Sequence, residues 1–345
     1  IKNKYGKVEM STSFSSNHNF SKGFFYVADG TFNFYDTEKK TAYQDCYASL
    51  NAGKTLGIGN YDSANIIHSN GKFYLLVGTS TSNRDHFYIV DAKTLYYENS
   101  AVVGANLSGL TILNEQYGLV TGDGIRRIDL KSLNNVRIKN ERLLCFYNSI
   151  IYNGKVLSND TYKDESKVKY YDVNELIAAK EGEAPAVTEL DIIQKQKINF
   201  VLAKDGNVYT LESADNGCNI VKIKNDFTLE KVFANFQPAK GPYHSSPTIG
   251  MVASETENII YLVSTDGAIY KYILGDSDSL KAPFIAAESG VSITAPLQLN
   301  QQSGELYVTY TEERKDESKI VVYSKDGKVL HTVDCGESVP SQILF

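Results

Sequence analysis

The sequence contains no tryptophan, although it has 24 tyrosines and 15 phenylalanines. This absence excludes repeat classes that depend on that residue. WD40 repeats need a Trp-Asp dipeptide, and the ring-shaped quinone-dependent dehydrogenases carry a repeated Trp docking motif. Kelch repeats need a diglycine, which the sequence also lacks.

An excess of positive charge is missing as well. The chain has 35 Lys and Arg residues against 41 Asp and Glu residues, which gives a formal net charge of −6. Because nucleic-acid backbones bind to basic surfaces, we expect no nucleic-acid partner. The run of about 20 apolar residues that crosses a bilayer is also absent, so we expect no membrane-spanning segment in this chain.

What the sequence does contain is one strand-rich pattern in seven copies. Each copy has a hydrophobic strand after a turn, as in residues 71–78 (GKFYLLVG). A second strand, a polar turn and a third strand follow, as in residues 87–100 (FYIVDAKTLYYENS). The copies align on Tyr26, Tyr74, Gly118, Leu157, Tyr209, Tyr261 and Tyr307. An all-strand repeat of about 47 residues is typical of propeller blades, so the sequence predicts an all-β, seven-bladed β-propeller with four-stranded blades.

A short apolar strand precedes six of the seven repeats. These innermost strands are expected within residues 64–70, 108–114, 145–153, 197–205, 247–255 and 295–302. The seventh, residues 339–345, ends the chain, and its natural partner is residues 23–30. We expect this C-terminal strand to close the first blade, because closure removes an exposed sheet edge. The predicted organisation is therefore a leader or linker over residues 1–22 and one propeller over residues 23–345.

Local signals support this arrangement. Two-residue hairpin turns are indicated at Asn70-Gly71, Asn153-Gly154, Asp205-Gly206 and Asp326-Gly327. Glycine supplies the positive φ that such turns require, and their recurrence favours turns over calcium loops. One segment, Asn174–Glu181, predicts a helix on the surface with Asn174 as its N-terminal cap.

The four cysteines, Cys46, Cys145, Cys218 and Cys335, show no CxxC pairing. This spacing excludes the standard zinc and iron–sulfur arrangements. Cys46 and Cys335 both fall near the ends of outer strands, but in different blades. Because neighbouring outer strands diverge in a propeller, we expect no disulfide between them.

An ordered set of motifs runs through residues 23–95: GFFYVADG (23–30), FNFYDTE (32–38), NAGKTLG (51–57), GKFYLLVG (71–78) and IVDAKTL (89–95). This set resembles the opening of the YncE-like seven-bladed propellers, which are surface lipoproteins of Bacteroidetes. The sequence departs from the family at Ala28-Asp29-Gly30, where the family often has Asn-Glu-Gly.

The resemblance implies a location at the cell surface or in the periplasm, with lipid anchoring through an N-terminal segment that has been removed. It implies no established catalysis. Some relatives sit beside outer-membrane transporters and capture a cofactor such as a corrinoid, but the sequence shows no motif for such a ligand. We therefore expect no cofactor.

Residues for recognition are expected at one mouth of the central channel. The blade-to-blade connections and the loops between second and third strands meet there. Aromatic side chains beside Arg and His can stack on a flat ligand and pair with its anionic groups. The predicted ligand-binding residues are Tyr61, Arg84, His86, Arg142, Tyr147, Tyr162, Tyr243, His244 and Arg314. The alternative is that these are ordinary solvated loop residues and tyrosines that pack between blades.

The sequence is compatible with three functions. The first is a non-catalytic cell-surface protein that binds a small molecule, a glycan or a partner protein. The second is a metal-dependent propeller enzyme of the lyase or lactonase type, although no catalytic residues and no metal ligands stand out and no G-x-S-x-G element is present. The third is a scaffold that docks onto an outer-membrane protein such as a transporter. We expect a monomer.

The cysteine positions generate a first testable prediction, that all four are free thiols. Alkylation of the unreduced, denatured protein should add four alkyl groups to its mass. Recovery of a cross-linked peptide pair, in particular Cys46 with Cys335, would show that the strands have been misassigned.

Overall fold

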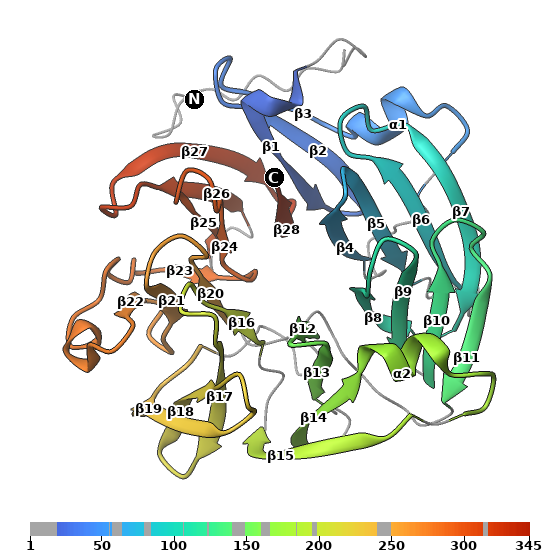
Figure 1. The fold of residues 1–345 in the computed structure, drawn as a ribbon. Helices are drawn as coiled ribbons and strands as arrows, with labels where there is room; N and C mark the ends of the chain where they lie inside the picture. Colours follow the sequence, from blue (N-terminus) through green and yellow to red (C-terminus); the bar gives the residue numbers. More distant parts are fainter. Residues whose placement is uncertain are drawn as a thin grey trace.

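The computed structural model describes residues 19–345, except residues 55, 57–63, 79–83, 106, 123, 140–148, 160–165, 184, 195–198, 240–249 and 313–316. In this part of the chain, seven antiparallel sheets are arranged in a ring around a central axis (Figure 1). None of the helices in the described ranges is long and apolar enough to cross a lipid bilayer.

Each sheet is one blade, and its strands follow one another from the axis outward. Blade 1 contains β28 (Pro340–Leu344), β1 (Gly23–Ala28), β2 (Thr31–Asp36) and β3 (Thr41–Tyr43). Blade 2 contains β4 (Ala64–Ser69), β5 (Lys72–Val77), β6 (Asp85–Asp91) and β7 (Tyr97–Gly104). Blade 3 contains β8 (Leu107–Ile112), β9 (Tyr117–Gly122), β10 (Gly124–Asp129) and β11 (Asn135–Lys139). Blade 4 contains β12 (Ile150–Tyr152), β13 (Lys155–Asn159), β14 (Ser166–Asp172) and β15 (Val187–Gln194).

The remaining blades are less regular. Blade 5 contains β16 (Val201–Leu202), β17 (Val208–Ala214), β18 (Gly217–Ile223) and β19 (Leu229–Phe236). Blade 6 contains β20 (Met251–Ala253), β21 (Ile259–Val263) and β22 (Ile269–Ile273). Blade 7 contains β23 (Val291–Ile293), β24 (Gln298–Leu299), β25 (Leu306–Glu312), β26 (Ser318–Tyr323) and β27 (Val329–Gly336). The described residues also form four short helices: η1 (Phe20–Lys22), α1 (Cys46–Leu50), α2 (Val173–Ala178) and η2 (Ser277–Leu280).

The predicted seven-bladed propeller and its closure are confirmed. The C-terminal β28 pairs antiparallel with β1, with Phe25 opposite Leu344. Aromatic rings continue the contact into blade 7, where Tyr307 lies 4.7 Å from Phe345 and 4.9 Å from Phe24 between ring centroids. The two ends of the described chain therefore complete one blade.

Blades 6 and 7 differ in detail from the sequence expectation. The outermost position of blade 6 is occupied by the turn of η2 and by an isolated bridge between Ile269 and Ile285, in place of a regular fourth strand. In blade 7 the inner position is split into β23 and β24, which both pair with β25. Pro296 lies between these two strands, and proline cannot donate to a strand ladder.

The core lies between the blades. Alternate side chains of each sheet face the neighbouring blade on either side, so the buried residues form separate clusters around the ring. Between blades 1 and 2, for example, Phe25, Phe32 and Phe73 are at most 4% exposed, and Phe25 and Phe73 meet edge to face at 5.6 Å. Burial of each such side chain is worth about 1.5–3 kcal/mol.

Amide side chains connect the backbone edge of β20 to both neighbouring blades. From blade 5, Asn199 donates to the carbonyl of Met251 at 2.6 Å and accepts from its N–H at 3.0 Å. From blade 7, Gln301 donates to the carbonyl of Ala253 at 2.9 Å and accepts from the N–H of Glu255 at 2.8 Å. Buried or half-buried backbone groups that would otherwise lack partners are thereby satisfied.

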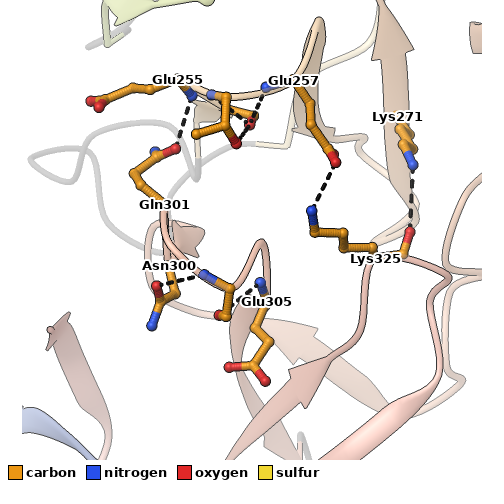
Figure 2. Close-up of polar contacts among 10 residues, drawn as sticks. Glu255, Glu257, Lys271, Asn300, Gln301, Glu305 and Lys325 are labelled. Atoms are coloured by element: carbon orange, nitrogen blue, oxygen red, sulfur yellow. Dashed lines mark hydrogen bonds and ion pairs between the residues drawn. The ribbon is translucent and has the colours of Figure 1, made fainter. Parts of the chain in front are cut away.

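One ion pair and one hydrogen bond reinforce the same junction between blades 6 and 7 (Figure 2). The ammonium of Lys325 lies 2.8 Å from the carboxylate of Glu257, and Lys271 donates to the backbone carbonyl of Lys325 at 3.4 Å. Glu257 and Lys325 belong to turns at one end of these blades, and Lys271 lies on β22.

The structure of helix α2 differs in two ways from the helix that the sequence predicted. Its N-terminal cap is Asp172, which accepts hydrogen bonds from the backbone of Asn174 and Glu175, so the predicted Asn174 cap was wrong by two positions. The helix is also more than a surface feature, because Leu176 is fully buried. Arg127 of blade 3 donates to the carbonyls of Ile177 and Ala179 at the end of the helix, so α2 joins blade 4 to blade 3.

An aspartate ends the third strand in each of the first four blades, at Asp36, Asp91, Asp129 and Asp172. Each accepts backbone hydrogen bonds from the turn that follows. In blade 3, Asp129 accepts from the N–H of Ser132 at 2.7 Å, and this bond is the largest cause of a pKa below the usual value for that carboxyl. These bonds favour the ionised carboxylate and stabilise the turn.

The outer strands carry irregularities that protect them from pairing with other chains. Bulges or register shifts occur where β7, β15, β19 and β27 meet the adjacent strand of their blade. Bulges increase the local twist and make an edge a poor template for another strand.

The closing strand leads to a prediction about truncation. Deletion of residues 339–345 should expose the edge of β1 along its whole length and the apolar face of blade 7. We expect the shortened chain to melt much lower or to aggregate, measured by thermal unfolding and size-exclusion chromatography. Wild-type melting and solubility after the deletion would contradict the closure.

The turn aspartates lead to a prediction about acid stability. The folded-state pKa of Asp129 lies below the unfolded value of about 3.9. Its ionised form therefore adds stability above the unfolded pKa, and this stability is lost as the pH falls through the folded pKa. Asp129→Asn keeps an oxygen for the turn but removes the charge, so its free energy of unfolding in urea should fall less between about pH 6 and about pH 3.

The control is Asp215→Asn, which changes an exposed carboxylate in another turn. Its unfolding free energy should follow that of the wild type over this range more closely than that of Asp129→Asn. Equal pH dependence in the wild type and Asp129→Asn would refute the role given to the charge.

Candidate functional site

Several long blade-to-blade connections lie at one end of the propeller. At one end, residues 44–63 connect β3 to β4, residues 140–149 connect β11 to β12, and residues 237–250 connect β19 to β20. At the other end, β4 and β5 are joined by residues 70–71, and β12 and β13 by residues 153–154. We call the first the loop-bearing end and the second the turn end.

Most of the predicted ligand-binding residues lie outside the described residues. These are Tyr61, Arg142, Tyr147, Tyr162, Tyr243, His244 and Arg314. The structure describes Arg84, which is exposed and directly precedes β6, and His86 within β6. Both belong to the loop-bearing end of blade 2, and the clustering of the full set stays a prediction.

His86 belongs to an aromatic group between blades 1 and 2. Its ring stacks on Tyr88 with centroids 5.9 Å apart and planes inclined by 23°. Tyr47 of α1 and Tyr97 of β7 lie close enough to act on one another electrostatically. The pKa of Tyr47 is raised mainly by burial and further by Tyr88 and Tyr97. Its hydroxyl is buried and has no hydrogen-bond partner among the described residues.

Two arginines that the sequence analysis did not select lie midway along the outer strands of blade 3. Arg126 on β10 and Arg137 on β11 are directly opposite each other in the antiparallel register. Arg126 also contacts blade 2, because its guanidinium lies over Gly104 at the end of β7. The adjacent arginines at 126 and 127 were a signal in the sequence, but only the blade assignment shows that they point to opposite faces. We use the name arginine corner for Arg84, Arg126 and Arg137, which belong to the neighbouring blades 2 and 3.

A second charged group lies between blades 6 and 7. Lys319 on β26 is 8% exposed, and its ammonium lies 3.5 Å from the carboxylate of Glu288 and 5.7 Å from the centre of the Tyr310 ring. The hydroxyl of Tyr310 is 3.1 Å from that of Tyr323. These contacts hold the segment after blade 6 against blade 7, so we assign this group to structure.

The described cysteines are free thiols that burial makes unreactive. Burial is the main cause that raises the pKa of Cys46 to about 12, of Cys218 to about 11 and of Cys335 to about 12. Little thiolate is present at neutral pH under these conditions. Within the described ranges, no group of three or more His, Cys, Asp or Glu side chains is placed to hold a metal ion.

The ring of seven antiparallel blades, closed by a strand from the opposite end of the chain, defines a seven-bladed β-propeller. Residues 20–344 match the family described as "Domain of unknown function (DUF5074)", and the chain belongs to this family. No match was found among curated proteins.

Solved structures share the fold at low sequence identity. A functionally unknown protein from Desulfotomaculum acetoxidans DSM 771 has a TM-score of 0.56 and 12% identity, over 93% of this chain and 99% of that one. Hsv2 from Kluyveromyces lactis has a TM-score of 0.50 and 11% identity, over 94% and 95% of the two chains. A structure from a study of two prolyl endopeptidases has a TM-score of 0.50 and 12% identity over 79% of this chain, which spans only 42% of that protein. Likeness at this level concerns the fold alone.

Proposed function

We propose that this protein is a non-catalytic binding protein that holds a small molecule, a glycan or a partner protein at the loop-bearing end of the propeller. The observation that carries the proposal is that the long blade-to-blade connections over residues 44–63, 140–149 and 237–250 meet at this end. Binding residues are concentrated on loops that a rigid scaffold positions, and two-residue hairpins offer little side-chain surface for recognition.

The distribution of charged groups supports this choice of end. At the turn end, carboxylates such as Asp129 and Asp172 accept backbone hydrogen bonds, and Lys155 pairs with Asp172 at 2.6 Å. These groups are committed to the turns of the scaffold. At the loop-bearing end, Arg84 and the ring of His86 supply cationic and aromatic groups of the kind that contact anionic or flat ligands.

The resemblance of residues 23–95 to the YncE-like propellers of Bacteroidetes suggests where such a protein would act. We place it at the cell surface or in the periplasm, anchored by lipid, with capture for an outer-membrane transporter as one use. Membrane fractionation and surface protease treatment of cells that express the tagged full-length protein test this location.

The binding role is tested by thermal shift with a panel of metabolites and glycans, using protein dialysed against a chelator. We expect at least one compound to stabilise the protein without being converted. The affinity for that compound should fall at least about tenfold in Arg84→Ala with His86→Ala, since a hydrogen bond to a charged group is worth about 1.5–3 kcal/mol. Lys93→Ala, an exposed change at the turn end, should bind like the wild type.

Two outcomes would contradict the proposal. One is equal affinity in the wild type and the double variant. The other is a stoichiometric divalent ion retained through dialysis, detected by elemental mass spectrometry, together with turnover of the bound compound. That second outcome would favour a metal-dependent lyase or lactonase.

A further inference from the structure

Hydroxyl side chains gather at the inner end of the junction between blades 3 and 4. The apolar core of this junction contains Leu119 on β9 and Val156 on β13. Thr121 and Ser158 follow these two residues by two positions each. Because side chains two positions apart on a strand share a face, both hydroxyls point into the junction. Each belongs to the last residue but one of its strand, near the loop-bearing end.

Two further hydroxyls connect the innermost strands of the same junction. Thr111 on β8 lies opposite Leu119 in register, so it also faces blade 4. Its hydroxyl is hydrogen-bonded to the hydroxyl of Ser149, which directly precedes β12 of blade 4. Ser149 lies beside Ser158, because β12 and β13 pair antiparallel from Ile150 onward. The junction therefore holds four neighbouring hydroxyls from two blades.

Two of these four hydroxyls have no hydrogen-bond partner within the described part of the chain. Thr121 is 3% exposed and Ser158 is 1% exposed, and the side-chain oxygen of each is buried and unpaired. Buried polar groups are nearly always hydrogen-bonded, because an unsatisfied one costs free energy. Two unpaired hydroxyls on facing sides of one junction point to a partner that they share.

Small residues surround the two unpaired hydroxyls. Gly109 on β8 is directly opposite Thr121 in register, so the neighbouring position on this face carries no side chain. The residues on the facing blade, Ser149 and Ser158, are small as well. None of these residues is charged, and a hydroxyl can both donate and accept. The surroundings suit a small neutral group that also donates and accepts hydrogen bonds.

We propose that one water molecule is bound between the hydroxyls of Thr121 and Ser158 and links blade 3 to blade 4. A buried water needs two to four polar partners. The two unpaired hydroxyls supply two of them, and the bonded pair of Thr111 and Ser149 lies next to them. This inference goes beyond the proposed binding function and is independent of it. It makes the water a structural part of the junction below the loop-bearing end.

The direct test is a high-resolution crystal structure of the wild-type protein. It should show one ordered water within about 3.2 Å of both Oγ1 of Thr121 and Oγ of Ser158. A direct hydrogen bond between the two hydroxyls, a protein group in place of the water, or no density between them would overturn the proposal.

The sign of a stability change tests the same water in solution. Thr121→Val keeps the shape of the side chain but removes its hydroxyl. Because the bound water then loses a partner, this variant should melt about 2–4 °C lower than the wild type. Ser158→Ala should also melt lower. Removal of a hydroxyl that has no partner is instead neutral or stabilising, so melting temperatures at or above that of the wild type in both variants would overturn the proposal.

A double variant shows whether the two hydroxyls share their partner. Thr121→Val with Ser158→Ala should lose less stability than the sum of the two single losses, because both remove contacts of one water. The matched control is Thr309→Val, which removes another buried, unpaired hydroxyl on β25 of blade 7. Its effect should add to that of Ser158→Ala, because blades 4 and 7 are not neighbours. Additive effects in both pairs would overturn the shared water.

Discussion

The pairing of β28 with β1 is the interaction on which the rest of the ring depends. Every blade buries both of its faces against neighbours, and no blade has a core of its own. Without the C-terminal strand, β1 would keep an open edge, and the apolar contact of Phe24 with Tyr307 would have one side in water. Because each blade is buried by the blades on both sides, loss of one interface between blades lowers the stability of the whole ring.

The interior polar contacts follow from the same geometry. Blades diverge from the axis, so backbone ladders cannot connect them, and side chains have to. Asn199 and Gln301 satisfy β20 from both sides, and Arg127 closes the end of α2. In these contacts and in the aspartate turns, polar side chains stabilise the scaffold. At the loop-bearing end, Arg84 and His86 lie at the start of β6, where the proposed binding would use them.

The repeat could be read from the sequence because the period of a blade and the alternation of its strands are local properties. The pairing of residues 339–345 with residues 23–30 could also be predicted, because the count of strands left one blade incomplete. The structure at the outer position of blade 6 could not be predicted, because a capped turn at Asp276 competes with a strand there. Helix α1 was missed for a similar reason, because it has only five residues and its cap at Asp45 adopts a left-handed conformation.

The arginine corner shows most clearly what sequence alone cannot supply. Arg84 was selected because its loop position is visible in the repeat. Arg126 and Arg137 were not, because their opposition depends on the register of β10 with β11, which shifts between Ile125 and Arg126. The contact of Arg126 with Gly104 depends on how blades 2 and 3 meet, and no local sequence pattern predicts it.

Hydrogen exchange of the wild-type protein, with and without the compound that stabilises it most in the thermal-shift panel, tests the central claim most directly. We expect added protection of backbone amides at the loop-bearing end, in particular at the start of β6 around His86. Protection confined to the turn end, for example around Asp91 and Asp129, or no change anywhere, would contradict it.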